Sequence, residues 1–205
     1  MSTVKTYPDA AALADAAARM IVERAAQAIA LRERFCIALS GGSTPHATYA
    51  RLAAPDLAKE VDWQRFHVFW GDERAVPPDN VESNYRMTHE AWLAHVPIPE
   101  ENVHRIRGEM PPEAAAAEYE GELRSFFASQ ARLSGPLVAR FDLILLGMGG
   151  DGHTASLFPG SAVIHEARRW VDAYRVEKLN MWRITVTPVV INAAAQVAFL
   201  VSGAK

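Results

Sequence analysis

The fold is decided by one stretch of the chain, Phe141-Asp-Leu-Ile-Leu-Leu-Gly-Met-Gly-Gly-Asp-Gly-His-Thr-Ala-Ser-Leu-Phe-Pro159. Its first six residues are almost all large and apolar, which is typical of a strand buried on both faces of a parallel sheet. Four glycines then follow within six residues, which suits a sharp turn or a close approach of the backbone to a ligand. Asp151 and His153 lie inside this turn, where an open α/β sheet places its ligand site. The imidazole of His153 is therefore a candidate general base.

Two other interpretations of the glycine-rich turn stay open at this point. Residues 147–152 match the dinucleotide pattern G-x-G-x-x-G, and Asp172 lies where the ribose-binding acid of that motif belongs. Against this, Pro159 and Gly160 stop any helix soon after the turn, whereas a dinucleotide-binding unit needs a full crossover helix. In the remaining interpretation the turn is only structural and His153 caps a helix.

A second glycine-rich loop follows a predicted buried strand at residues 35–39. It reads Ser40-Gly-Gly-Ser-Thr-Pro45 and opens onto a helix that we expect to begin at Pro45. Backbone N–H groups and hydroxyls at a helix N-terminus bind anions, and the helix dipole favours this. No Gly-Lys-Ser/Thr closes the loop, so it is not a Walker P-loop. We therefore predict an anion site, with a plain turn as the alternative, at Gly41, Gly42, Ser43 and Thr44.

A third polar segment, residues 71–74, follows a predicted strand at 66–70. We expect it to be a loop, and its position at the end of a strand makes Asp72 and Arg74 candidates for ligand contact. Along the whole chain, strand patterns alternate with helical ones, which indicates a single α/β domain with a mostly parallel sheet and helices on both faces. The predicted helices cover residues 9–32, 82–95 and 111–133. The other predicted strands cover residues 103–106, 141–146, 170–176, 183–186 and 197–201.

Composition excludes several classes of protein. The 205 residues carry a formal net charge of −3, which argues against a nucleic-acid-binding protein and means that an anionic substrate needs a local basic cluster. The single cysteine, Cys36, lies in an apolar run, so a disulfide framework is excluded. The seven histidines show no metal-binding spacing, and we expect no metal. Charged residues interrupt the Ala-rich N-terminal segment, so we expect no membrane segment and a cytoplasmic protein.

Four blocks of the chain together resemble one family. They are residues 39–45, 70–74, 147–160, and 183–188 with 201–205, in the family's order. They are similar to the 6-phosphogluconolactonases, within the wider group that includes glucosamine-6-phosphate deaminase. The resemblance implies a Rossmann-like α/β fold without a nucleotide, metal or other cofactor. It also implies hydrolysis of 6-phospho-D-glucono-1,5-lactone in the oxidative pentose phosphate pathway.

The resemblance also implies roles for the candidate residues. His153 would activate water and then protonate the leaving ring oxygen, since an imidazole serves as base and acid near neutral pH. Asp151 would orient or polarise this imidazole, or contact the sugar. Arg74 would face the charge of the substrate or the oxyanion, and Asp72 would line the pocket beside it. The phosphate would bind the loop at residues 41–44, with Arg183 and Lys205 as cationic partners.

Two alternatives accompany this interpretation. A glucosamine-6-phosphate deaminase would carry a carboxylate five residues after the histidine, where this chain has Phe158. A sugar-phosphate-binding paralogue without catalysis would keep the anion loop, Arg183 and Lys205 but lose the base. The family usually continues beyond the last block, so we expect the C-terminal end of the usual domain to be missing here. The chain itself would be a monomer or a homodimer.

Overall fold

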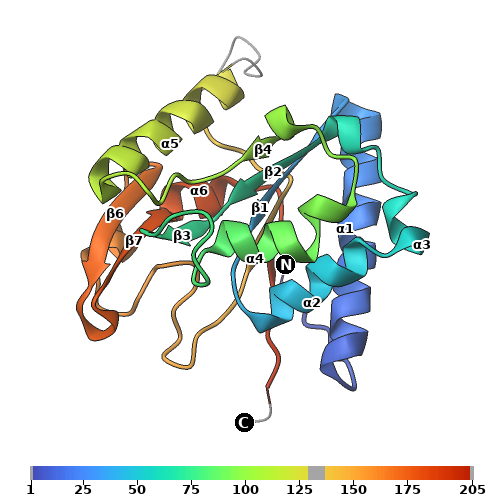
Figure 1. Cartoon of the computed structure of the whole chain (residues 1–205), viewed down its shortest axis with the longest axis horizontal. Coiled ribbons are helices and arrows are strands. Elements are labelled where there is room, and N and C mark those ends of the chain that lie inside the picture. The colour runs from blue at the N-terminus through green and yellow to red at the C-terminus, as the bar shows by residue number, and fades with distance from the viewer. Residues whose placement is uncertain (1, 129–136, 204–205) are drawn as a thin grey trace.

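The centre of the protein is a five-stranded parallel sheet with the strand order β4-β2-β1-β5-β8 (Figure 1). It is seen in a computed structural model that describes residues 2–128 and 137–203. All residues of β1 and β5 are buried, as expected of strands covered on both faces. The parallel α/β sheet predicted from the sequence is confirmed. Its strands are β1 (Phe35–Leu39), β2 (Phe66–Trp70), β4 (Val103–His104), β5 (Leu143–Leu146) and β8 (Val197–Phe199).

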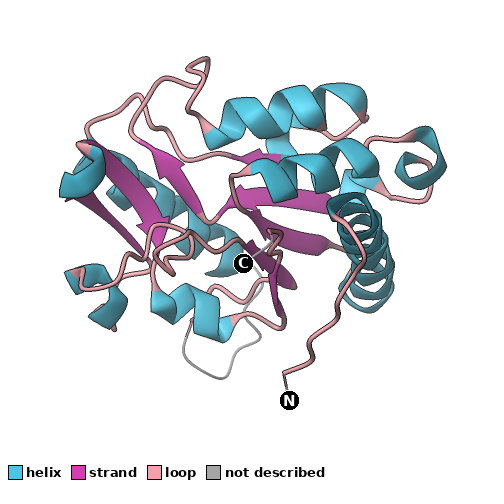
Figure 2. Cartoon of the chain, turned by 90° about the horizontal axis from the view of Figure 1, so that it is seen from below, coloured by secondary structure: helices cyan, strands magenta, loops and turns pink. Residues whose placement is uncertain are grey.

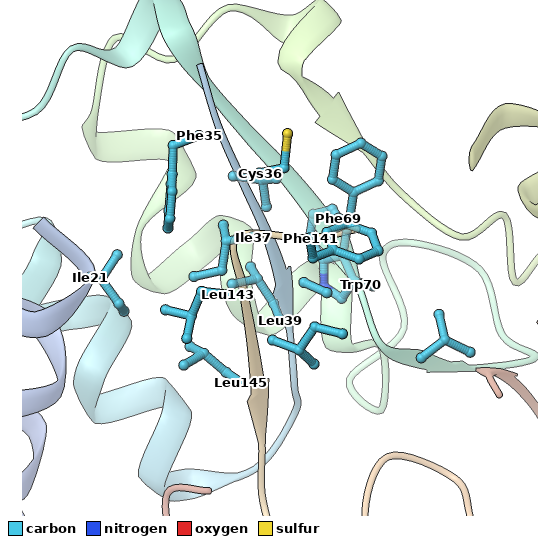
Figure 3. Close-up of a cluster of buried hydrophobic side chains, with 14 of the residues drawn as sticks. Ile21, Phe35, Cys36, Ile37, Leu39, Phe69, Trp70, Phe141, Leu143 and Leu145 are labelled. Carbon is cyan, nitrogen blue, oxygen red and sulfur yellow. The ribbon is translucent and has the colours of Figure 1, made fainter. Parts of the chain in front are cut away.

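Helices cover both faces of this sheet. Figure 3 shows Phe35 and Ile37 of β1 on the side of Ile21, which belongs to α1, with Phe69 and Phe141 on the other side. On that second side Phe127 of α5 packs against the Phe69 and Phe141 rings, at 6.2 and 5.0 Å between centroids. The helices are α1 (Ala10–Arg32), α2 (Ser43–Leu52), α3 (Pro55–Ala58), α4 (Asn84–Ala91), α5 (Pro112–Ala128) and α6 (Pro188–Ala193).

The helix ends differ from the predicted ones in instructive places. α1 ends at the predicted Arg32 and begins at Ala10, because Asp9 is its N-cap and accepts a hydrogen bond from the Ala12 N–H at 2.8 Å. α4 is shorter than predicted: Ser83 caps its start, and a short 3₁₀ turn, Leu93–His95, follows its end. The predicted end of the 111–133 helix lies outside the described residues. Within the described residues, no helix is long and apolar enough to cross a lipid bilayer.

A second sheet is antiparallel and has the order β3-β7-β6. Its strands are β3 (Asp72–Arg74), β6 (Val171–Val176) and β7 (Met181–Val186). The prediction that residues 71–74 form a loop is therefore wrong for 72–74. Charged residues disfavour strands locally, but here pairing with β7 overrides that preference. Both sheets contribute side chains to one continuous core, which fits the predicted single domain.

The segments that follow the parallel strands gather at one edge of the molecule. The segment after β5 and residues 200–203 after β8 both lie at the lower edge in Figure 1, which faces the viewer in Figure 2. In a parallel sheet all carboxyl ends meet at the same edge. A single residue, Gly71, separates the end of β2 from the start of β3, so β3 brings the antiparallel sheet to this edge as well.

Candidate active site

A cavity of about 290 Å³ lies at this edge, between the parallel sheet and the antiparallel one. Eight of the ten predicted site residues line it, although they come from four separate segments of the chain. Asp151 does not line the cavity but contacts His153, which does. Lys205 lies outside the described residues. The eight lining residues are Gly41, Gly42, Ser43, Thr44, Asp72, Arg74, His153 and Arg183.

The glycine-rich turn presents His153 by letting the backbone pass directly beneath its ring. The turn is closed by hydrogen bonds from the Gly149 N–H to the His153 carbonyl, at 2.8 Å, and from the Gly152 N–H to the Gly149 carbonyl, at 2.9 Å. A Cβ on Gly149 would lie only 2.1 Å from Cε1 and 2.2 Å from Nδ1 of the imidazole. Gly149 is therefore required for the close approach of the ring, and not for an unusual φ.

Neighbouring side chains fix the orientation of the imidazole. Nδ1 of His153 lies 2.5 Å from Oδ1 of Asp151, so Nδ1 carries a proton and donates it to the carboxylate. The ring also stacks on Phe158, with 4.0 Å between the ring centres. Lys178 binds the other oxygen of Asp151. This arrangement leaves Nε2 of His153 as the unprotonated nitrogen.

The surroundings of His153 favour its neutral form. Burial lowers the pKa of this imidazole below its ordinary value of 6.5, and the positive charges of Arg183 and Arg74 act in the same direction. The Asp72 carboxylate opposes them. The charge of Asp151 is partly offset by Lys178. At neutral pH the ring is therefore available to accept a proton.

Two arginines make the cavity attractive for an anion. Arg74 of β3 and Arg183 of β7 are direct cross-strand neighbours, an arrangement in which like charges repel. The Nε atoms of both are buried without a hydrogen-bond partner among the described residues. Burial lowers the pKa of Arg183, and so does the charge of Arg74. An anion between the two guanidinium groups would relieve both the repulsion and the missing hydrogen bonds.

The anion loop has a slightly different geometry from the predicted one. α2 begins at Ser43, two residues before Pro45, and its N-cap is Gly42 with φ 106°. The helix starts early because the Gly42 carbonyl already accepts the His46 N–H, at 3.0 Å. The first N–H groups of the helix have no intrahelical acceptor. The hydroxyl of Thr44 lies 2.6 Å from that of Ser202, which ties the loop to the C-terminal segment.

Asn84 is a site residue that sequence reasoning missed. It is buried, and its Nδ2 donates to the Asp72 carbonyl at 2.9 Å, while its Oδ1 accepts from the Arg74 guanidinium. It also packs against the anion loop, since a Cβ on Gly41 would lie 2.0 Å from its Oδ1. Asn84 therefore connects three predicted site residues, Asp72, Arg74 and Gly41. Its place just after the N-cap Ser83 gave no signal of this role.

Glu73 holds Asn84 in place. Its buried carboxylate accepts the N–H groups of Asn84 and Tyr85 at 2.7 and 2.8 Å, and that of Arg74 at 2.8 Å. Burial raises the pKa of Glu73, and these three backbone donors oppose the rise. The carboxylate lies at the N-terminus of α4, where the helix dipole stabilises negative charge. It therefore fixes the start of α4 relative to β3.

Asp72 is held from the opposite side of the cavity. Ser156 donates a hydrogen bond from its Oγ to Oδ2 of Asp72 at 2.6 Å, and Tyr174 donates to the Ser156 carbonyl at 2.6 Å. Residue 155, between the glycine turn and Ser156, is an alanine with φ 47°, which is strained for a side chain with a Cβ. These contacts link β3 to the segment after β5.

The structure does not support the two other interpretations of the glycine-rich turn. No helix starts at the turn: the next helical element is the 3₁₀ segment Ala162–His165. A dinucleotide-binding unit therefore lacks its crossover helix, and His153 has no helix to cap. Asp172 lies in β6, where both its oxygens accept from Arg169 at 2.7 and 2.8 Å. In the described part of the chain, no group of three His, Cys, Asp or Glu side chains could hold a metal ion.

Comparison with known proteins gives a consistent result. A family model described as glucosamine-6-phosphate isomerases/6-phosphogluconolactonase matches residues 8–205. The chain is 43% identical over 204 residues to a 6-phosphogluconolactonase of Nostoc sp., and the aligned region covers 99% of this chain and 81% of that protein. It is 45% identical over 186 residues to a 6-phosphogluconolactonase of Synechocystis sp., with 90% and 73% covered. The structure of 6-phosphogluconolactonase from Trypanosoma brucei matches with a TM-score of 0.85 and 33% identity, with 99% and 82% covered.

Proposed function

The chain belongs to the family of glucosamine-6-phosphate isomerases and 6-phosphogluconolactonases, and on this premise we propose that it hydrolyses 6-phospho-D-glucono-1,5-lactone to 6-phospho-D-gluconate. One observation of the site carries the proposal. A neutral imidazole with a free Nε2 faces the same cavity as two arginines whose Nε atoms have no partner among the described residues. Lactone hydrolysis with an anionic substrate needs a base and a positive field in one cavity.

His153 acts first as the general base. Its Nε2 takes a proton from water while the water oxygen forms a bond to C1 of the lactone. The imidazolium that results is stabilised by the Asp151 carboxylate on Nδ1, at 2.5 Å. Because this contact already exists before the reaction, the ring need not reorient as it gains the proton.

The tetrahedral intermediate then collapses. Its oxyanion draws on the positive charge of the guanidinium groups that face the cavity, and we assign Arg74 to the oxyanion or to the adjacent charge of the substrate. The bond between C1 and the ring oxygen breaks as His153 returns its proton to that oxygen. The products are the open-chain acid and the free base, so the cycle needs no other proton donor.

The phosphate anchors the substrate at the other end of the cavity. We place it on the amides and hydroxyls of residues 41–44, at the N-terminus of α2, with Arg183 as its cationic partner. Lys205 remains part of the proposal from sequence alone. Binding energy from the phosphate, remote from the reacting carbonyl, then holds C1 near His153.

The deaminase alternative lacks a residue that it needs. Its extra carboxylate would occupy position 158, where a buried phenylalanine instead stacks on the imidazole. A hydrocarbon ring cannot exchange protons with a sugar, but it can shield and orient a neutral base. Because the base is present, the non-catalytic paralogue is also the weaker candidate.

The deciding experiment compares three substrates with one protein. We expect saturable hydrolysis of 6-phosphogluconolactone above its spontaneous rate, slower turnover of unphosphorylated gluconolactone, and no ammonia from glucosamine 6-phosphate. Ammonia release would establish the deaminase, and saturable lactone binding without turnover would establish the paralogue. Equal handling of the two lactones would refute the phosphate assignment.

The cellular location and the oligomeric state of the protein are also proposals. We propose a cytoplasmic protein, in keeping with its one free and buried cysteine, Cys36. We further propose a monomer or homodimer, because a single chain already brings eight of the ten predicted site residues to one cavity. Sedimentation analysis of the purified protein distinguishes these two states.

A further inference from the structure

The tip of the β6–β7 hairpin reaches the turn that carries His153. Lys178 lies in the short 3₁₀ helix η5 (Glu177–Leu179) that joins the two strands. Its ammonium group is ion-paired with Oδ2 of Asp151, 27 residues earlier in the chain, and lies 4.6 Å from the centre of the Phe158 ring. Lys178 therefore contacts both of the side chains that orient His153.

We propose that Lys178 positions the general base: its ammonium holds Asp151 so that the carboxylate keeps His153 in the tautomer with Nε2 free for water. The proposal rests on the proposed function, since it concerns the base of that reaction. Lys178 does not line the cavity, so it acts on the substrate only through Asp151. It is a positioning residue and not a catalytic one.

Asp151 needs a second partner because of where it lies. It follows Gly149 and Gly150 and precedes Gly152, and its side chain is 34% exposed. An exposed carboxylate on a glycine-rich turn exchanges rotamers readily unless both oxygens are held. Here Oδ1 contacts His153 and Oδ2 contacts Lys178. Loss of the lysine frees one end of this bridge.

The charge of Lys178 also acts on the imidazole. The groups around His153 are Asp151 of the turn, Asp72 and Arg74 of β3, Arg183 of β7, and Lys178 of the hairpin. The two carboxylates favour the protonated ring and the three cations oppose it. Removal of Lys178 takes away one of these cations while Oδ1 of Asp151 still accepts from Nδ1, so the pKa of His153 should rise. Because partly exposed charges interact only weakly through solvent, we expect this rise to be on the order of half a pKa unit.

The experiment uses three variants of the full chain. Lys178→Met removes the ammonium, Lys178→Arg keeps the charge, and Arg175→Met removes a positive charge from the same hairpin without touching Asp151. Arg175 is exposed, and its guanidinium group donates hydrogen bonds to two residues of the same hairpin, Glu177 and Asn180. The Lys178 side chain is 52% exposed, so all three should fold. For each we would measure kcat and KM for 6-phosphogluconolactone over a range of pH, and titrate His153 by NMR without substrate.

We expect Lys178→Met to lower kcat by roughly three- to tenfold with little change in KM, because the base is misplaced while substrate contacts remain. Its His153 titration should move up by about half a unit, Lys178→Arg should restore most of both properties, and Arg175→Met should match the parent. An unchanged His153 titration in Lys178→Met, or an equal shift in Arg175→Met, would overturn the proposal. If the titration shifts as expected but the parent hydrolyses no lactone, the positioning contact stands and the proposed function fails.

Discussion

Gly149→Ala should abolish most of the activity while leaving the fold intact. The added Cβ would lie 2.1 Å from Cε1 of His153 and 3.0 Å from Oδ1 of Asp151. Ordinary contacts between such atoms are about 3.5 Å or more, so the imidazole must retreat by more than about 1 Å. A displacement of that size can cost about 10²-fold in rate. The backbone of Gly149 does not have a positive φ, so alanine adds no backbone strain.

Gly150 provides the matched control in the same turn. A Cβ there would meet nothing within 4 Å, and its φ is not positive either. We expect Gly150→Ala to keep kcat within about twofold of the parent, since no atom has to move. The assay couples product formation to oxidation of 6-phosphogluconate, with the spontaneous lactone hydrolysis subtracted, and thermal melts verify folding. Near-native kcat in Gly149→Ala would show that the imidazole position does not limit the rate and would refute the role assigned to Gly149.

Three further predictions concern single side chains. His153→Ala should lower kcat by at least about 10²-fold. In the parent protein, kcat/KM should fall with decreasing pH only below about 6.5, because the lowered pKa of His153 keeps the base neutral above that value. A kcat/KM that already falls as the pH is lowered to 7 would contradict the assignment of His153 as the base. Arg183→Ala should raise KM for the phosphorylated lactone roughly tenfold or more and leave the unphosphorylated lactone little affected, since a lost charge-assisted contact costs about 1.5–3 kcal/mol; equal losses on both lactones would place Arg183 elsewhere. Asn84→Ala should lower kcat/KM and reduce the free energy of unfolding in urea by about 1–3 kcal/mol, because the Asp72 carbonyl and the Arg74 guanidinium lose a buried partner. An unaltered unfolding midpoint would contradict the predicted loss of stability.

The parallel sheet could be predicted because its strands are local features of the sequence. Residues 35–39 and 143–146 are uninterrupted apolar runs, and each is followed directly by glycine and polar residues. Such runs indicate burial on both faces wherever they occur in the chain. Because carboxyl ends share one edge, the loops that follow could also be predicted to meet there.

The antiparallel sheet and the supports of the site could not be predicted in this way. β3 consists of Asp72, Glu73 and Arg74, which have low strand propensity, and it exists because of pairing with β7 more than 100 residues later. Asn84 looks like an ordinary first residue after a helix N-cap until its contacts with β3 are known. The sequence also left open whether Asp151 orients His153 or contacts the sugar, because it does not give the distance between Asp151 Oδ1 and His153 Nδ1. The described residues leave the prediction for Lys205 untested.

The neighbouring guanidinium groups of Arg74 and Arg183 make the stability of the antiparallel sheet depend on whether an anion is bound in the cavity. With the cavity empty, Arg74 and Arg183 oppose each other across neighbouring strands, and that repulsion weakens the folded state. Any small dianion that fits, including inorganic phosphate, should therefore act as a conformational stabiliser and as a competitor of the lactone at the same concentrations. If the melting temperature rises over the same phosphate concentrations that inhibit lactone hydrolysis, both effects come from one binding event.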